Sequence, residues 1–257
     1  AYGHGLVETA KLFCDYQLNG STAKHLEVEP LSKHPSKFTG ADWLGVDNID
    51  EAILLRQNGI KTPILVMGYT PPDRFKEATG YDLRFTIYDS EVLKLIKKNY
   101  SLQTTHYKLH LKIDTGMSRQ GVTLSDLPKF LKNLPRGINI EGVFTHFANA
   151  DNLQDRSYPN LQLANFKRVL EIFKSLNIET KLAHASATTG LLTMPDAQFD
   201  MVRVGIALYG LWPSIEFAQK FKKLGLEPTL NWKTRVVQIK KIKKGTPVGY
   251  GITAKVK

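Results

Sequence analysis

Short runs of apolar and β-branched residues alternate with helical patterns along most of this 257-residue chain. Strands that alternate with helices form a parallel sheet with right-handed crossovers, because parallel neighbours need a long connection. The loop and helix that open the chain also imply a further strand upstream of them. Eight such units predict a (β/α)8 TIM-type barrel whose first strand is missing. The seven runs span residues 42–46, 63–68, 83–88, 107–113, 138–147, 181–185 and 201–207.

Three helices are predicted from spacing and end signals: one from Asp50 to the stop at Asn58-Gly59, one starting near Ser90, and one over 166–176. An open doubly wound sheet is the alternative fold. It is disfavoured because no Gly-x-Gly-x-x-Gly motif follows an early strand. Residues 19–40 interrupt the pattern as a long polar insertion.

The pattern changes after Leu211. A strand is predicted over Trp232–Ile239, a turn follows at 245–247, and helical signals are absent. We therefore expect a β/α barrel over residues 1–225 and the start of an all-β C-terminal domain over 226–257. Because the chain opens without methionine and ends shortly after a turn, it is expected to be a fragment.

Charge and composition disfavour several classes of protein. The net charge is +11 and the pI is about 9.5, but the basic residues are scattered and lack interleaved aromatic residues. Nucleic-acid binding is therefore not expected, whereas binding of small anions stays open. No apolar run approaches the ~18–20 residues of a membrane span. The single cysteine, Cys14, suits a cytoplasmic protein and is expected to pack on a helix. No metal site is predicted.

Polar residues at the carboxyl ends of barrel strands are the candidates for chemistry. Lys112 and Arg119 flank a glycine-containing loop, His146 interrupts an apolar strand, and Arg203 precedes Gly205. Three of these residues also have a structural interpretation. Lys112 could extend to water, His146 could be a satisfied core residue, and Arg203 could pair with a carboxylate.

Seven stretches, in this order, make the chain resemble the alanine racemases, which combine a pyridoxal-phosphate-binding barrel with a β-domain. They are AYGHG at Ala1, ADWLGV at Ala41, PILVMGYTPP at Pro63, KIDTGMSRQGV at Lys112, EGVFTHFANAD at Glu141, DMVRVGIALYGLWPS at Asp200 and VGYG at Val248. The family's cofactor lysine lies just before the alanine matched by Ala1. The chain on its own is therefore expected to be inactive.

The resemblance implies contacts with pyridoxal 5'-phosphate. Tyr2 and the backbone amides of Gly205 and Ile206 would bind the cofactor phosphate. Thr188 would add a hydroxyl, although the family commonly has asparagine-serine at the positions aligned with Ala187-Thr188. Ser186 is the alternative source of that hydroxyl.

The resemblance also assigns the catalytic groups. Arg203 would donate to the pyridine nitrogen, and His146 would link it to Tyr250. Tyr250 would be one of two acid/base groups and would come from a partner subunit of a homodimer. Arg119 would contact the substrate carboxylate, oriented by Lys112, which is carbamylated in some members.

The function implied is interconversion of L-alanine and D-alanine by two-base proton transfer, which supplies D-alanine for peptidoglycan. A racemase of another small amino acid such as serine is one alternative, and discrimination of one hydroxyl can be modest. A non-catalytic barrel that binds pyridoxal phosphate is another.

Overall fold

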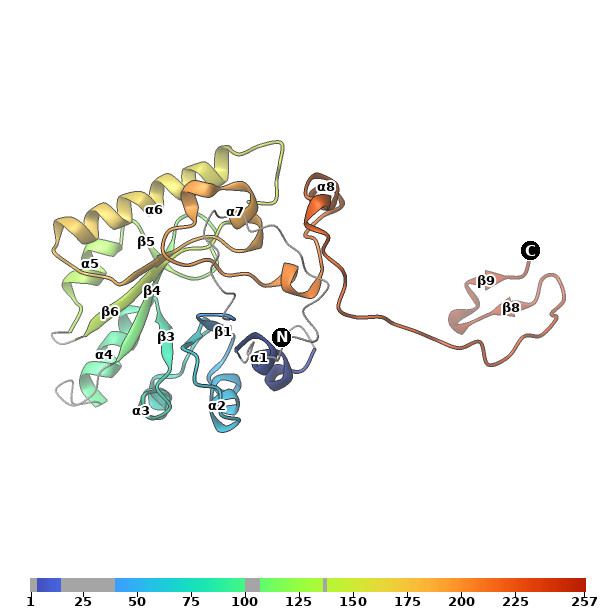
Figure 1. The fold of residues 1–257 in the computed structure, drawn as a ribbon, viewed down its shortest axis with the longest axis horizontal. Helices are drawn as coiled ribbons and strands as arrows, with labels where there is room; N and C mark the ends of the chain where they lie inside the picture. Colours follow the sequence, from blue (N-terminus) through green and yellow to red (C-terminus); the bar gives the residue numbers. More distant parts are fainter. Residues whose placement is uncertain (1–3, 15–39, 100–106, 136–137) are drawn as a thin grey trace.

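A computed structural model describes residues 4–14, 40–99, 107–135 and 138–257. The main feature is a curved parallel sheet with helices on its outer face (Figure 1). Its strands are β1 (Leu44–Val46), β2 (Ile64–Val66), β3 (Arg84–Ile87), β4 (Lys108–Asp114), β5 (Val122–Thr123), β6 (Asn139–Phe144) and β7 (Leu182–His184).

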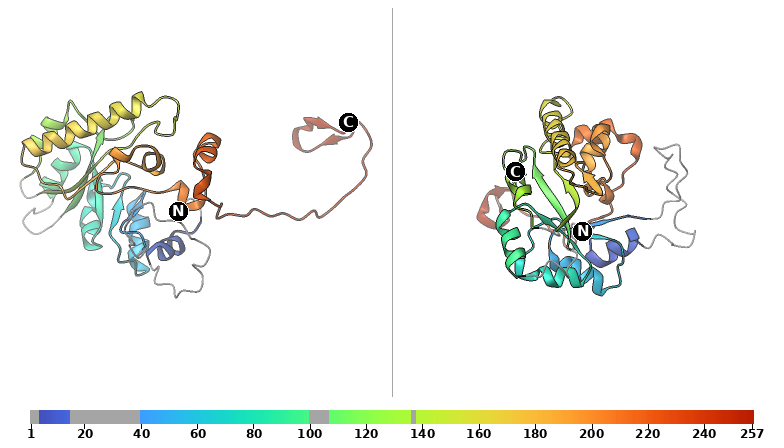
Figure 2. Two further views of the ribbon diagram at one scale, coloured as in Figure 1. Left: turned by 45° about the horizontal axis from the view of Figure 1, so that its top comes forward. Right: turned by 90° about the vertical axis from the view of Figure 1, so that its left-hand side faces the viewer.

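The strands pair in the order β1-β2-β3-β4-β6-β7, with β5 beside the end of β4. Every pairing is parallel, and the order follows the chain without reversal. A doubly wound sheet reverses its strand order at a switch point, whereas a barrel does not. The sheet is therefore part of a TIM-type barrel, as predicted, and two views show how it curls (Figure 2).

Helices connect the strands. The α-helices are α1 (Leu6–Cys14), α2 (Ile49–Gln57), α3 (Phe75–Gly80), α4 (Ser90–Asn99), α5 (Leu127–Lys132), α6 (Ser157–Ser175), α7 (Thr188–Thr193) and α8 (Ile215–Lys220). The 3-10 helices are η1 (Pro72–Arg74), η2 (Pro195–Ala197), η3 (Ile206–Tyr209), η4 (Lys222–Leu224) and η5 (Tyr250–Ile252). No helix of the described residues is long and apolar enough to cross a membrane.

The predicted helix boundaries agree with the structure where end signals were clear. The Asn48 side chain accepts from the Glu51 backbone amide at 3.0 Å at the start of α2, and Gly59 has a φ of 85° just past its end. The helix predicted over 166–176 begins earlier, at Ser157, because its first turns also bury apolar residues. Cys14 packs partly buried against the core from α1, as expected.

Strand β4 shows how the fold separates the hydrophobic core beneath the helices from the polar inside of the barrel. Leu109, Leu111 and Ile113 alternate with His110 and Lys112, and all five are buried. Neighbouring side chains of a strand point to opposite faces. The apolar face belongs to the hydrophobic cluster shared with the helices, so the polar face is directed into the barrel.

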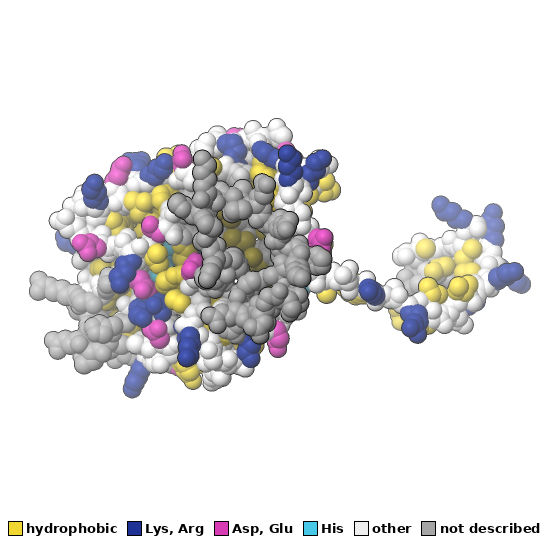
Figure 3. Space-filling view, viewed as in Figure 1, with side chains coloured by type: hydrophobic (Ala, Val, Ile, Leu, Met, Phe, Trp, Pro, Cys, Tyr) yellow, Lys and Arg dark blue, Asp and Glu magenta, His cyan; other side chains and the backbone are white. Residues whose placement is uncertain are grey.

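Two of the predicted strands differ from the structure. The run over 201–207 makes one parallel bridge, Ala187 to Arg203, before η3 begins at Ile206. The strand predicted over 232–239 is wrong, because this segment is extended and exposed and has no neighbouring strand. The chain ends in an antiparallel hairpin of β8 (Pro247–Val248) and β9 (Ala254–Lys255), set apart from the barrel (Figure 1 and Figure 3). The predicted insertion at 19–40 lies almost wholly outside the described residues.

Candidate active site

Arg203 lies at the carboxyl ends of strands β6 and β7. Its backbone amide donates to Ser186 O at 2.9 Å. Its Nη2 donates to Thr145 O at 2.8 Å and to Ala185 O at 2.9 Å, and Nη1 lies 2.6 Å from His184 Nδ1. Acceptors on two neighbouring strands therefore fix the plane of the guanidinium.

The third guanidinium nitrogen of Arg203, Nε, has no partner among the described residues. Its Nε is buried and forms no hydrogen bond among the described residues, where Arg203 also forms no ion pair. The alternative of a structural arginine–carboxylate pair is thus wrong for the described part of the chain. Burial lowers the pKa of Arg203 to about 10, so the group stays cationic at neutral pH. A buried N–H without a partner is costly and calls for an acceptor.

His146 follows β6 and contacts the same guanidinium. Its Nδ1 lies 3.1 Å from Arg203 Nη2. Burial, with the charges of Arg203, Arg119 and Lys112, lowers the pKa of His146 to about 4. Because a guanidinium can only donate, Nδ1 is the acceptor and a neutral His146 carries its proton on Nε2.

Lys112 is buried near the end of β4, which excludes an extended side chain in water. Its Nζ donates to Gln120 Oε1 at 3.0 Å and lies 5.7 Å from the centre of the Phe144 ring. Burial, together with the charges of Arg119 and Arg203, lowers the pKa of Lys112 to about 8. A sizeable fraction of this amine is therefore neutral near physiological pH.

The loop after β4 is organised by Asp114. Its Oδ1 accepts from the backbone amides of Gly116, Met117 and Ser118 at 2.9, 2.9 and 3.0 Å. Ser118 has a φ of 57°, and exposed Arg119 follows it. Three amides binding one carboxylate oxygen stabilise the turn of this loop, and Arg119 after it lies close enough for its charge to act on Lys112 and His146.

The groups predicted to bind a phosphate lie beside Arg203. Thr188 begins α7 and is buried, and its Oγ1 accepts from Gly205 N at 3.4 Å. Ile206 begins η3 directly after Gly205. Ser186, the alternative hydroxyl, instead donates to Ala197 O at 2.8 Å. The fold therefore brings Thr188, Gly205 and Ile206 together.

The two predicted tyrosines are not part of this cluster. Tyr250 lies at the tip of the β8–β9 hairpin and is fully exposed, with a relative accessibility of 103%. Tyr2 lies outside the described residues. Its neighbour His4 stacks on Tyr209 with ring centres 4.7 Å apart, which places the start of α1 beside η3.

Sequence reasoning gave no role to His184, His110 or Glu141. His184 binds Arg203, and its ring stacks on Phe144 with centres 4.6 Å apart. A signal was present, because His110 and His184 each interrupt an apolar strand as His146 does. Their spacing in the sequence could not show that His110 and His184, 74 residues apart, are in contact.

Comparison with known proteins identifies the family of the chain. The family described as alanine racemase, N-terminal domain, matches residues 21–213. An alanine racemase of Carboxydothermus hydrogenoformans is 36% identical over 98% of this chain and 62% of its own length. Alanine racemase 1 of Oceanobacillus iheyensis is 37% identical over 100% of this chain and 62% of its own length.

Solved structures give the same result. The alanine racemase from Bacillus anthracis with bound L-Ala-P has a TM-score of 0.77 and 36% identity, covering 85% of this chain and 57% of that one. An alanine racemase of Clostridium difficile has a TM-score of 0.77 and 30% identity, covering 99% and 61%. The chain thus spans about three fifths of these relatives. It belongs to the alanine racemase family.

Proposed function

We propose that the complete protein is a pyridoxal-phosphate-dependent alanine racemase that interconverts L-alanine and D-alanine. The observation that carries this proposal is the buried, unpartnered Nε of Arg203, held in place by four acceptors. An aromatic ring nitrogen without a proton is the acceptor that such a donor would match. The residues present therefore fit the cofactor.

When bound, pyridoxal phosphate supplies a conjugated ring that withdraws electrons from the α-carbon of an amino acid. Arg203 would donate from Nε to the ring nitrogen and, with its pKa near 10, would not transfer its proton at neutral pH. A ring nitrogen that is only hydrogen-bonded withdraws electrons less strongly than a protonated one. Arg203 would thereby favour return of the α-proton over other reactions.

The phosphate would lie at the other end of the cluster. The Thr188 hydroxyl and the amides of Gly205 and Ile206 provide neutral donors at the start of η3. His4 stacks on Tyr209 and brings the start of α1 beside η3. From the family resemblance, Tyr2 is proposed as a further donor to the phosphate.

Proton transfer would need Tyr250. Its phenolic oxygen would take the α-proton on one face of the substrate, with the Nε2–H of His146 donating to that oxygen. Because Tyr250 is fully exposed on a hairpin apart from the barrel, we propose that it enters the site of a partner subunit in a homodimer. Trp232 and Val237, 92% and 93% exposed in the connecting segment, would be covered there.

Lys112 and Arg119 would bind the carboxylate end of alanine. Arg119 is exposed, and its charge acts on His146 together with the charges of Lys112 and Arg203. Its guanidinium is therefore accessible to an anion. The lowered pKa of Lys112 supports carbamylation, because only the neutral amine reacts with carbon dioxide. A carbamate there would carry negative charge and orient Arg119.

The test is to incubate the complete gene product with pyridoxal phosphate and L-alanine and to measure D-alanine. We expect racemisation, and slower turnover of L-serine. Faster turnover of serine would favour the serine alternative, and cofactor binding without any D-amino acid would favour a non-catalytic barrel. A cytoplasmic location and supply of D-alanine to peptidoglycan are part of the same proposal.

A further inference from the structure

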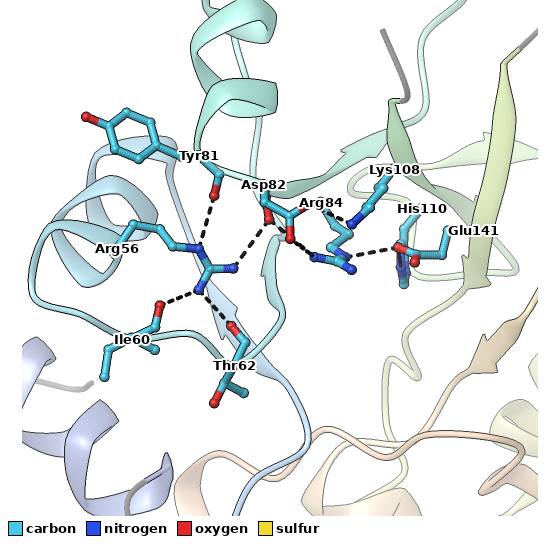
Figure 4. A network of polar contacts seen from close by, with 9 residues as sticks. All are labelled: Arg56, Ile60, Thr62, Tyr81, Asp82, Arg84, Lys108, His110 and Glu141. Carbon is cyan, nitrogen blue, oxygen red and sulfur yellow. Dashed lines mark hydrogen bonds and ion pairs between the residues drawn. The ribbon is translucent and has the colours of Figure 1, made fainter.

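A line of polar side chains runs through the barrel from Arg203 to the opposite end of the sheet. His184 Nε2 lies 3.1 Å from His110 Nδ1, and both rings are fully buried. His110 Nε2 forms no hydrogen bond among the described residues but lies 3.7 Å from Glu141 Oε2, and Glu141 accepts from Arg84 Nε at 3.1 Å. Figure 4 shows Glu141 between His110 and Arg84. The proposed function uses neither His110 nor Glu141.

A β-bulge places Glu141 in this line. Leu109 pairs with Ile140, but His110 pairs with Gly142, so the register skips Glu141. Bulges are uncommon in parallel pairs, and they redirect a side chain. A Cβ on Gly142 would lie 2.5 Å from two ring atoms of His110. The bulge and the glycine together allow the imidazole to lie against β6 with Glu141 at its Nε2.

The donors and acceptors of this line can be arranged in one direction. Arg203 only donates, so His184 Nδ1 accepts and a neutral His184 carries its proton on Nε2. That proton requires His110 Nδ1 as its acceptor, which leaves the proton of His110 on Nε2, facing the carboxylate of Glu141. The opposite tautomer of His110 would set two N–H groups against each other.

We propose that Glu141 is a positioning residue for Arg203. Acting through His110 and His184, its carboxylate favours from the opposite end the Nε2–H tautomer that Arg203 requires of both imidazoles, and so strengthens the acceptor that faces the guanidinium. The proposal rests on the proposed function only for the role of Arg203 toward the cofactor.

The surrounding charges agree with neutral imidazoles and an ionised carboxylate. Burial lowers the pKa of His110 and His184, and the charges of Arg84 and Arg203 act in the same direction. Burial raises the pKa of Glu141, but its contacts with His110 and Arg84 outweigh this and lower it. On the far side, Arg84 also pairs with Asp82, which binds Lys108 at 2.6 Å.

Asp82 offers a matched control. It is a carboxylate on the same arginine, but its side chain is 64% exposed and does not face His110. Long-range ¹H–¹⁵N spectra of the complete protein, labelled with ¹⁵N-histidine, report the tautomer of each ring. We expect Nε2–H signals for both histidines in the wild type and in Asp82→Asn. In Glu141→Gln, Arg203 still requires this arrangement, so we expect the Nε2–H signals to persist and to give way to mixed tautomers only when Arg203→Met is added.

A second variant separates the two ends of the line. In Arg203→Met the carboxylate is intact, so both rings should keep the Nε2–H tautomer. Mixed tautomers in Arg203→Met, or Nε2–H signals that persist unchanged in the double variant Arg203→Met/Glu141→Gln, would overturn the proposal. The racemisation kcat/KM should fall about tenfold in Glu141→Gln and stay within about twofold in Asp82→Asn. The spectra can be recorded whether or not the protein is an active racemase. A failure of the proposed function can therefore be told apart from a failure of this proposal.

Discussion

Adding one methyl group to the barrel interior gives the sharpest test of the packing around His110. In Gly142→Ala, the new Cβ would stand 2.5 Å from His110 Cε1 and Nδ1 and 3.0 Å from Cγ. The ring is fully buried, so it can escape only by moving away from β6. That movement would break its contact with His184.

The magnitude follows from three effects. Overpacking costs about 1–3 kcal/mol, and an unpaired buried N–H on His184 costs about 1–3 kcal/mol. Replacing glycine by alanine in a strand stabilises the fold by about 0.5–1 kcal/mol, because less conformational entropy is lost on folding. The net loss should be about 1–5.5 kcal/mol, or roughly 2–22 °C in Tm at about 2–4 °C per kcal/mol.

Scanning calorimetry of the complete protein without cofactor measures this loss. The matched control is Gly80→Ala at the end of α3, where a Cβ meets nothing within 4 Å. That variant should be neutral or slightly stabilised, because alanine favours the helix. If Gly142→Ala kept the Tm of Gly80→Ala, the close approach of His110 to β6 would be refuted.

Four further predictions follow from the same geometry. The neutral fraction of Lys112 should rise from about a tenth at pH 7 to about half at pH 8, given its pKa of about 8. ¹³C-bicarbonate should therefore label the wild type increasingly over this range, and NMR should find no label in Lys112→Arg. Arg203→Lys should lower kcat/KM at least tenfold, because one ammonium cannot serve His184 and donate toward the cofactor together; an unchanged kcat/KM would contradict this role. Tyr250→Phe and Arg203→Met should each be inactive alone but regain activity when mixed subunits reassemble, and no recovery would argue against exchange of the tyrosine. The lowered pKa of Glu141 contributes stability above its ordinary value near 4.3 and loses it as pH falls through the folded value, so the Tm difference between wild type and Glu141→Gln should shrink below about pH 4.

The sequence predicted those features that depend on local patterns. The strand runs, the start and stop of α2, and the polar residues at strand ends all depend on neighbouring residues. The strand predicted at Trp232–Ile239 failed because alternation makes a strand only where another strand is available to pair with it. Arg203 was chosen because a charge in a buried run needs a partner, and its partners proved to be neutral acceptors.

The line behind Arg203 could not be predicted, because it depends on register. Glu141 reaches His110 only through a bulge in the pairing of β4 and β6. His110 and His184 meet although β4 and β7 are not neighbours and are separated by β6. Contacts of this kind join different strands across the barrel interior, so the pattern of residues within one strand cannot predict them.

The charges at the site indicate what it is built to receive. Lys112, Arg119 and Arg203 lie close enough for their charges to lower the pKa of His146. The nearby carboxylate, Asp114, has one oxygen bound by three backbone amides of its own loop. Among the described residues none of these three cations forms an ion pair, and the charge of Asp114 only partly offsets the repulsion at Lys112, so binding an anion would be favourable. A cofactor with a phosphate and a substrate with a carboxylate would both supply that negative charge. Occupation of the site should therefore raise the pKa of His146 toward its ordinary value, and ¹⁵N-histidine spectra recorded with and without cofactor would measure that change.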